Sequence, residues 1–191
     1  MDYKHIYETD SFHNLSTIGQ QLLPQALQRR RQKGRPPRLR ITRDDKLEGR
    51  PVKARIVKLP ISNLHILNPG NNYDCRISIN LEVNLDRPDL DADSLIDYEK
   101  DQSQPSEVPR KKDRMAYKHL DVYSIDLTRV DREGMEPTFE LELEIDSKIL
   151  REHMKMMAAG EANGFADLVS GFLENATFLM RQRHVPAATA A

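Results

Sequence analysis

Hydrophobic and polar residues alternate along much of the central part of the chain. In the segment 75–84, cysteine, isoleucine, leucine and valine occupy every second position, with arginine, serine, asparagine and glutamate between them. A period of two is typical of a β-strand with one apolar and one polar face. The same pattern predicts further strands, at 38–42, 52–58, 110–119, 122–130 and 138–146.

The two ends of the chain follow a helical period instead. Residues 11–31 place leucine and isoleucine along a rough helical stripe, so we expect a helix from Ser11 that breaks or kinks at Pro24. Towards the C-terminus we expect one helix that ends at Gly160 and a second that starts near Asn163 and carries a long apolar stripe.

Charge and turn residues divide the chain into parts. The segment 29–38 is basic and contains proline and glycine, which is typical of a solvated connector; an RNA-backbone contact or a nuclear address are the alternatives. We therefore predict an N-terminal helix and basic linker over 1–37, a domain over 38–183, and a disordered tail over 184–191. Strands followed by helices predict an α+β fold.

Composition adds a few limits. The formal net charge of the 191 residues is −1, so any site for a polyanion has to be a local cluster of basic residues. The single cysteine, Cys75, excludes an internal disulfide and fits a reducing compartment. No apolar run is long enough to span a membrane, and the first residues lack the pattern of a secretory signal. We expect a protein of the cytoplasm or nucleus.

The segment "FELELEID", residues 139–146, raises the question of chemistry. Glu140, Glu142 and Glu144 share one strand face, about 7 Å apart. Carboxylates at that spacing repel one another unless cations lie among them. Suitable cations are a metal ion with oxygen ligands or basic side chains from facing strands. The alternative is an ordinary antiparallel sheet with one face in water.

Basic residues occupy the polar faces of two other predicted strands. They are Arg76, Lys112 and Arg114. If the sheet closes into a barrel with a polar interior, covered outside by the helices, these residues would face the glutamates. Such an interior suits a triphosphate, because a metal ion binds carboxylates and one phosphate oxygen while arginine and lysine hold the others.

Four segments occur in the order and with the rough spacing of a known family: "YDCRISINLE", "RKKDRMAYKH", "YSIDLTRV" and "FELELEID". Together they resemble the fungal RNA 5′-triphosphatases, the β subunits of the mRNA capping apparatus, which are triphosphate tunnel metalloenzymes. The resemblance covers roughly residues 38–183. It implies an antiparallel β-barrel tunnel with a polar lumen and flanking helices. The implied reaction is hydrolysis of the γ-phosphate of nascent mRNA, with Mg²⁺ or Mn²⁺, in the nucleus, as the first step of cap formation.

The resemblance also implies roles for particular side chains. It gives metal ligation to Glu140, Glu142 and Glu144. It gives contacts with phosphate oxygens to Arg76, Lys112 and Arg114. It gives the lining of the tunnel, next to the attacking water, to Asp126 and Thr128. The implied partners are triphosphate-ended RNA and an mRNA guanylyltransferase, and a homodimer is compatible with the resemblance.

Two departures from the family pattern affect these expectations. The family begins its catalytic domain with a strand that carries a glutamate pair, E-x-E, whereas residues 1–37 show only Glu8 in "HIYETDSF". On this interpretation the barrel lacks its first strand and the metal site is half built. Ser124 also stands where a basic residue is expected. The alternative function is therefore a non-catalytic binding or scaffold module, similar to the Mediator subunit that shares this fold.

Overall fold

The computed structural model describes residues 3–25, 36–69, 74–103 and 107–181. The expected disordered tail and most of the basic linker lie outside the described residues. The strands are β1 (Tyr3–Asn14), β2 (Arg38–Asp44), β3 (Val52–Ile66), β4 (Cys75–Asn84), β5 (Arg110–His119), β6 (Tyr123–Asp131) and β7 (Thr138–Ile145). The helices are α1 (Thr17–Gln21), the 3₁₀ turn η1 (Asp93–Leu95), α3 (Tyr98–Ser103), α4 (Ser147–Ala158) and α5 (Phe165–Met180).

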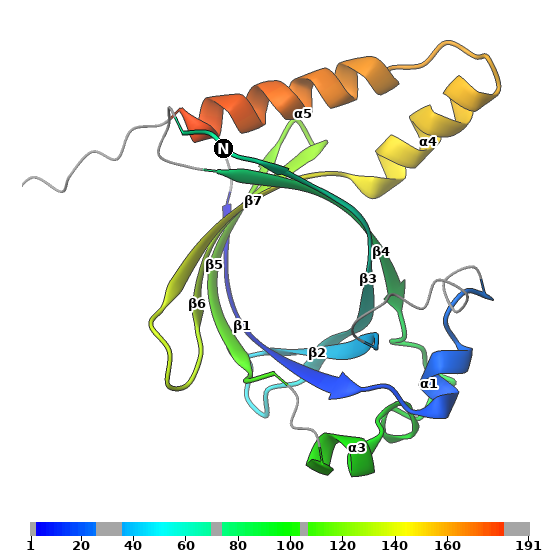
Figure 1. Cartoon of the computed structure of the whole chain (residues 1–191), viewed down its shortest axis with the longest axis vertical. Helices are drawn as coiled ribbons and strands as arrows, with labels where there is room; N and C mark the ends of the chain where they lie inside the picture. Colours follow the sequence, from blue (N-terminus) through cyan, green and yellow to red (C-terminus); the bar gives the residue numbers. More distant parts are fainter. Residues whose placement is uncertain (1–2, 26–35, 70–73, 104–106, 182–191) are drawn as a thin grey trace, which may run out of the picture.

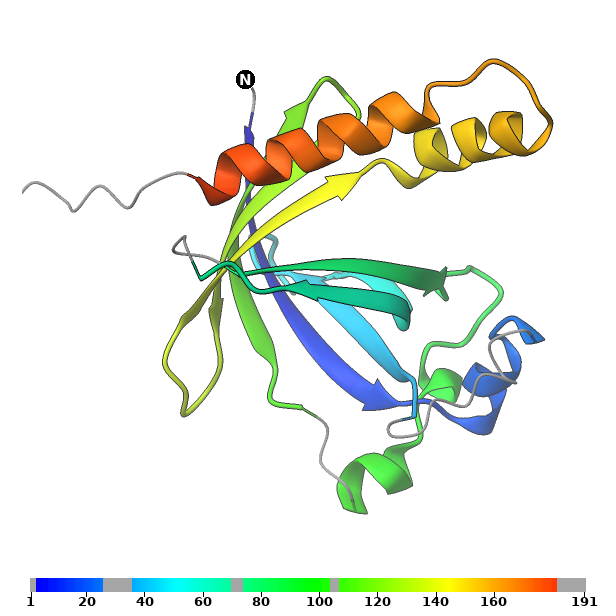
Figure 2. The same ribbon diagram turned by 45° about the horizontal axis from the view of Figure 1, so that its top comes forward.

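All seven strands form one antiparallel sheet in the order β4-β3-β2-β1-β5-β6-β7. The sheet curls around an open centre, with the helices on its outside (Figure 1). Within the described residues β4 and β7 are its two edges and do not pair, so the sheet is a half-barrel whose mouth is visible in Figure 2. The predicted fold class, an antiparallel tunnel-like sheet flanked by helices, is confirmed. None of the helices described is long and apolar enough to cross a membrane.

The N-terminal segment departs from the sequence prediction. β1 continues to Asn14 and α1 has only five residues, so the helix expected from Ser11 is wrong. Aromatic and β-branched residues are frequent in β1 and favour a strand, and the leucines of the helical stripe begin only at Leu15. Because β1 pairs with both β2 and β5, the sheet begins well before residue 38, and the N-terminal segment supplies one of its central strands.

The main apolar core lies on the outer side of the sheet, below α1 and η1. Leu39, Ile41 and Val57 come from β2 and β3. They pack with residues of the surrounding loops and turns, namely Leu15, Leu23, Leu85, Leu95 and Ile96. Leu95 is fully buried, so the acidic segment between β4 and α3 is anchored at this point. Since the apolar residues of β2 and β3 point outward, the positions that alternate with them point into the curled sheet.

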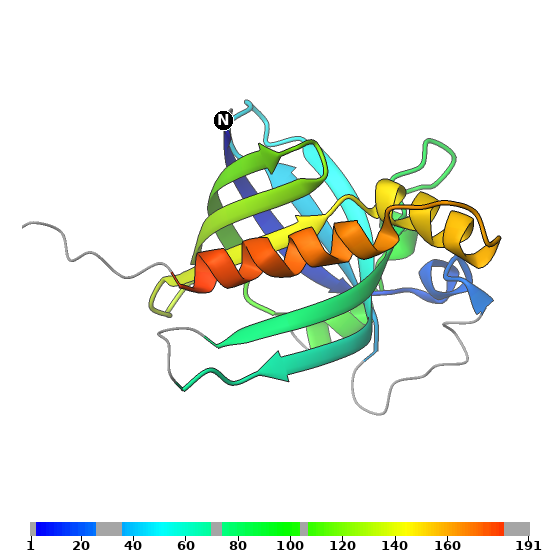
Figure 3. The ribbon, with the colours of Figure 1, turned by 90° about the horizontal axis from the view of Figure 1, so that it is seen from above.

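The C-terminal helices cover the opposite part of the outer surface. Asp146 begins α4 by accepting hydrogen bonds from the backbone N–H groups of Lys148 and Ile149, at 2.8 and 3.1 Å. Helix α5 is attached to β6 by the Tyr123 hydroxyl, which donates to the Leu168 carbonyl at 2.9 Å. Seen from above, α5 crosses between β7 and the β3–β4 hairpin (Figure 3), so it spans the open side of the sheet.

The contact between α5 and β6 depends on Gly171. A methyl group at this position would overlap the hydroxyl of Tyr123, which is itself only 6% exposed. We expect Gly171→Val to lower the free energy of unfolding by about 1–3 kcal/mol, the usual cost of overpacking, as measured by urea denaturation. Ser170→Val, on the exposed side of the same helix, is the control. Equal stability of the two variants would contradict close packing of α5 on Tyr123.

Candidate active site

Charged residues from all seven strands line the inner face of the sheet. Strand alternation and the cross-strand register assign to this face Glu8 and Asp10 (β1), Arg40 (β2), Lys58 (β3), Glu82 (β4), Arg110, Lys112 and Arg114 (β5), Asp126 (β6), and Glu140, Glu142 and Glu144 (β7). The two signs of charge are interleaved, since each basic residue of β5 has acidic residues on one or both neighbouring strands. The face is therefore an interior of alternating carboxylates and cations.

Asp10 and Lys112 form the most deeply buried ion pair in the described part of the chain. Their charged groups lie 2.6 Å apart, and their side chains are 1% and 9% exposed. The Thr42 hydroxyl donates a second hydrogen bond to Asp10, also at 2.6 Å. Burial alone would raise the pKa of Asp10, but the charge and hydrogen bonds of Lys112 and Thr42 outweigh burial and lower it. Asp10 is therefore a carboxylate at neutral pH.

Arg114 joins β1 to β6 across the inner face. Its guanidinium lies 3.5 Å from the Glu8 carboxylate and 3.0 Å from that of Asp126. Lys53 approaches Glu8 from β3, at 3.3 Å. Burial raises the pKa of Asp126; Arg114 opposes the rise, while the nearby carboxylates of Glu142 and Glu8 add to it. The carboxylates of Glu8, Asp126 and Glu142 thus lie within electrostatic range of one another around Arg114.

The two edges of the sheet face each other through the interior. Partial removal of the Glu144 carboxyl group on β7 from water raises its pKa, and the charge of the neighbouring Glu142 adds to the rise. Lys58 on β3 opposes the rise. Lys58 in turn pairs with Glu82 on β4 at 3.6 Å, and Arg40 lies 3.9 Å from the same carboxylate. Charges on β3 and β4 thus act on β7, although these strands are not hydrogen-bonded neighbours.

Several polar atoms of this face are buried without a hydrogen-bond partner among the described residues. They are the Nε atoms of Arg40, Arg110 and Arg114, and the hydroxyl oxygen of Thr128. A buried N–H group without an acceptor is costly, so such groups call for a ligand. An anion with several oxygen atoms, such as a phosphate chain, would satisfy all three arginines.

The carboxylate oxygens of this face are suitable ligands for a metal ion, although the described side chains do not surround a single point where an ion could bind. Within the described ranges, no group of three His, Cys, Asp or Glu side chains lies close enough to hold an ion as placed. Lys112 and Arg114 instead lie against the carboxylates of β1. Carboxylate oxygens are the ligands that Mg²⁺ and Mn²⁺ prefer, and burial together with neighbouring carboxylates raises the pKa of Asp126 and of Glu144.

Most residues that the sequence singled out share this inner face. Those on it are Lys112, Arg114, Asp126, Thr128, Glu140, Glu142 and Glu144. Arg76 has the same strand face but lies opposite His65, six residues from Glu82 and therefore about 20 Å along β4. Its side chain is exposed and makes no ion pair with other described residues. The structure does not bring Arg76 to the charge cluster; Arg40 and Lys58 stand nearer to it.

The acidic pair that the sequence analysis missed is present in β1. Glu8 and Asp10 are two residues apart, on the same face and both buried, so Glu8, which the sequence analysis found without a second glutamate, has an acidic partner in Asp10. The segment "YETDSF" contained the signal, because its two acids have the spacing of one strand face.

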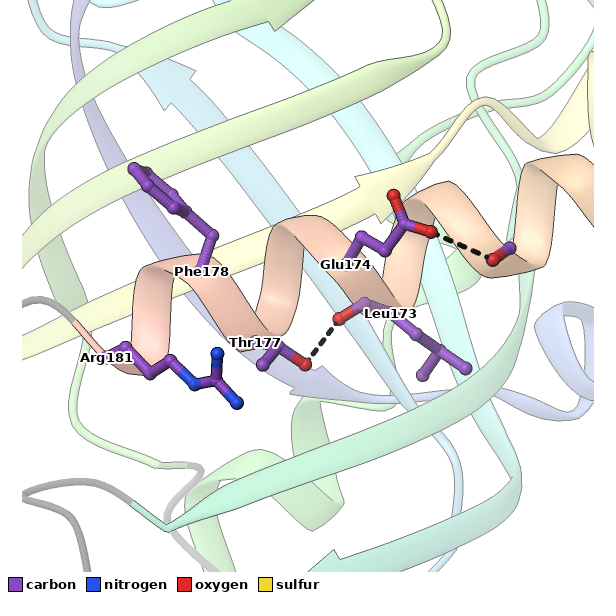
Figure 4. A pocket seen from close by; sticks show the side chains of 6 residues that line it. Leu173, Glu174, Thr177, Phe178 and Arg181 are labelled. Carbon is purple, nitrogen blue, oxygen red and sulfur yellow. Dashed lines mark hydrogen bonds between the residues drawn. The ribbon is translucent and has the colours of Figure 1, made fainter.

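A separate depression of about 360 Å³ lies along α5 (Figure 4). It is lined by Ser170, Leu173, Glu174, Thr177, Phe178 and Arg181. These side chains come from α5 and from Arg181 directly after it, on the outside of the sheet, and none belongs to the charge cluster. The depression is therefore distinct from the candidate active site.

Comparison with known proteins gives a consistent family. The model of the family described as "mRNA capping enzyme, beta chain" matches residues 1–185. The mRNA-capping enzyme subunit beta of Candida albicans is 31% identical over 173 residues, which are 90% of this chain and 29% of that protein. The corresponding subunit of Candida glabrata is 34% identical over 156 residues, covering 78% and 24%. The chain thus spans less than a third of the length of these two relatives.

The solved structures that resemble this fold include the S. pombe Pct1 RNA triphosphatase. Its complex with the Spt5 CTD superimposes with a TM-score of 0.68 at 22% identity, covering 95% of this chain and 59% of that one. Pct1 without the CTD gives a TM-score of 0.66 at 21% identity. At this level of identity the likeness shows that the fold is shared.

Proposed function

Because the chain belongs to the family of mRNA capping enzyme beta chains, we propose that its inner face removes the γ-phosphate from triphosphate-ended RNA, the first step of cap formation. Water attacks the γ-phosphorus, and the bond from this phosphorus to the oxygen that bridges it to the β-phosphate breaks. The products are inorganic phosphate and RNA with a 5′-diphosphate. The observation that carries this proposal is the row of buried arginine N–H groups without acceptors, interleaved with carboxylates on one concave face. Such a face offers phosphate ligands and metal ligands side by side.

The basic residues would hold the phosphate chain. Arg40, Lys112 and Arg114 are paired with carboxylates in this structure. When substrate enters, these side chains can turn and bind phosphate oxygens instead. Moving Lys112 away from Asp10 and Arg114 away from Glu8 would free these two carboxylates for a metal ion. The family resemblance assigns tunnel-lining roles to Asp126 and Thr128, and the Thr128 hydroxyl has a free hydrogen-bonding capacity with which to orient the attacking water.

We propose Mg²⁺ or Mn²⁺ as the cofactor, held by Glu8 and Asp10 on one side and by Glu142 and Glu144 on the other. When bound, the ion neutralises phosphate charge and polarises the bond to the γ-phosphorus. Glu140 lies on the same face of β7, two residues before Glu142, and adds a further carboxylate beside these proposed ligands. Before substrate binds, the carboxylates of Asp10, Glu8 and Asp126 hold Lys112 and Arg114 on the inner face, close to where phosphate would enter.

The proposal is tested with RNA that carries a label on its γ-phosphate. We expect release of labelled phosphate that requires Mg²⁺ or Mn²⁺ and leaves diphosphate-ended RNA, with no release from RNA that already ends in a diphosphate. The assay should include this chain and a form extended at both ends. Absence of release from both forms, at every metal concentration, would contradict the proposal.

One observation favours a second function, a non-catalytic phosphate-binding module. The carboxylates are paired with basic residues and do not converge on a metal position in the described part of the chain. Such a module would bind inorganic tripolyphosphate without metal and without hydrolysis. Calorimetry of tripolyphosphate binding, with and without Mn²⁺, separates the two functions, because the enzyme should bind more tightly when the metal is present.

The partners follow from the same premise. We propose that triphosphate-ended RNA is the substrate and that an mRNA guanylyltransferase acts on the product. We propose a nuclear localisation. The S. pombe Pct1 structure was determined with the Spt5 CTD, and a similar contact is a proposal for this chain. Homodimer formation stays a prediction.

Glu144→Gln tests the proposed metal ligation by its effect on the thermal stability of the protein. Because the pKa of Glu144 is raised, its charge destabilises the folded state increasingly as pH rises above the ordinary value of 4.5. The amide removes this effect, so we expect a small rise in metal-free melting temperature at neutral pH; it is small because the exposed side chain is screened by water. At a hundredfold excess over the dissociation constant, metal adds about 2.7 kcal/mol to wild-type stability. The variant should lose most of that gain.

Differential scanning fluorimetry across Mn²⁺ concentrations measures both effects. Glu161→Gln, an exposed position in the loop between α4 and α5, is the control and should keep the full metal response. A full response in Glu144→Gln would remove this residue from the metal site.

A further inference from the structure

One aromatic residue lies on the charged inner face. Phe12 of β1 shares the face of Glu8 and Asp10, and it stands opposite Arg40 of β2. It is two residues beyond Asp10, which corresponds to about 7 Å along the strand. Its side chain is only half-buried. The ring is therefore the next side chain along β1 after the two acids of the candidate active site.

Arginine side chains hold this ring. The guanidinium carbon of Arg110 lies 4.8 Å from the ring centroid, within the range of a cation–π contact. Arg40 occupies the cross-strand position on the other side. The Nε atoms of both arginines are buried without an acceptor among the described residues. An apolar face and two incompletely satisfied guanidinium groups thus occur together, directly beside the proposed phosphate-binding row.

This combination matches the chemistry of a nucleotide. A base stacks on an aromatic face, and the phosphate that links it to the chain accepts hydrogen bonds from arginine. In a triphosphate-ended RNA, the α-phosphate and the first nucleoside follow the γ-phosphate. They must therefore lie beyond the row of Asp10 and Lys112 at one end of the tunnel.

The opposite end offers a poorer match. There the inner-face positions next to the acids are Ile6, Ala116 and Ser124. None of them provides an aromatic ring, although Ile6 lies opposite Arg114, Ala116 opposite Lys4 and Ser124 opposite Lys118. The aromatic ring therefore favours a substrate orientation that places the nucleoside on the side of Phe12.

We propose that Phe12, held by Arg110, stacks against the first base of the substrate and makes the site prefer nucleoside-bearing triphosphates to inorganic tripolyphosphate. This inference rests on the proposed triphosphatase function. It assigns the preference to the ring face of Phe12, since phosphate contacts are common to both substrates and cannot distinguish them.

Phe12→Leu is the main test, because leucine keeps the apolar side chain and removes the aromatic face. We expect kcat/KM for triphosphate-ended RNA to fall about tenfold to a hundredfold, the usual effect of losing one base-stacking contact. Hydrolysis of inorganic tripolyphosphate should stay within twofold of wild type. Phe12→Tyr should keep both activities. Phe139→Leu, at an 80% exposed position of β7, is the matched control and should also keep both.

Equal loss on both substrates would overturn the inference, because it would make Phe12 a support for the phosphate site or the fold. No loss on RNA would overturn it as well. Failure of the proposed function looks different, since neither substrate is then hydrolysed by wild type. In that case the fluorescence of 2-aminopurine at the first position of a triphosphate-ended oligonucleotide decides. Quenching by wild type but not by Phe12→Leu supports stacking, and equal fluorescence contradicts it.

Discussion

Glu8→Gln is expected to lower γ-phosphate release from triphosphate-ended RNA by a factor of about 10²–10³, the usual effect of removing one positioned polar group from an active site. Glu8 is 6% exposed and faces Arg114 and Lys53. Glutamine has nearly the same shape but no charge, so it removes a metal-binding oxygen and releases Arg114 from one of its two carboxylates. Steady-state phosphate release at saturating Mn²⁺ measures the effect.

The same substitution at an exposed position gives the control. Glu48 lies in the turn between β2 and β3, and Glu48→Gln should leave the rate unchanged. Circular dichroism should show that both variants are folded. If Glu8→Gln retains more than a tenth of wild-type activity, Glu8 has no direct part in the reaction.

Asp10→Ala is expected to destabilise the protein by about 3–5 kcal/mol, because it leaves the buried ammonium of Lys112 without its partner. The pKa of Asp10 is lowered in the folded protein, so its contribution is present above the ordinary value of 3.8 and disappears as pH falls through the folded pKa. The difference between wild type and variant should therefore shrink below pH 3.8. Urea denaturation at several pH values measures both quantities.

Two further variants separate the buried pair from general effects of charge. Asp89→Ala removes a carboxylate that pairs with Arg87 at 2.6 Å on the surface, and it should change stability little. Asp10→Ala combined with Lys112→Met should recover most of the loss, because no unpaired charge then remains buried. If the double variant is as unstable as Asp10→Ala, the loss comes from packing and the ion pair is not its cause.

The strands with one apolar face could be predicted from the sequence because alternation is a local property. Residues 75–84 and 138–146 carry it clearly, and both are strands close to the expected bounds. β1 was missed because Thr9, Ser11 and His13 make its outer face polar too, so no amphipathic contrast is visible. Its place in the middle of the sheet comes from pairing with β2 and β5, which is not encoded locally.

The candidate site shows the same limit. Alternation indicated correctly which face carries Lys112 and Glu142, but it could not indicate how far along the tunnel each residue lies. Arg76 has the expected face, yet the register of the β3–β4 hairpin, with an irregularity between Pro60 and Ser62, leaves it at the far end. Lys58 becomes a neighbour of Glu82 by the same pairing. Register depends on the whole sheet and could not be read from single strands.

The position of bound Mn²⁺ is the most direct test of a metal-dependent phosphate site on the inner face. Anomalous scattering from crystals grown with Mn²⁺ and a non-hydrolysable triphosphate-ended nucleotide would locate the ion. We expect one strong peak coordinated by carboxylate oxygens of Glu8 and Asp10 from β1 and of Glu142 and Glu144 from β7, with Lys112 and Arg114 turned towards phosphate oxygens. A peak only on the outer surface, with Lys112 still paired to Asp10, would contradict the proposed metal site.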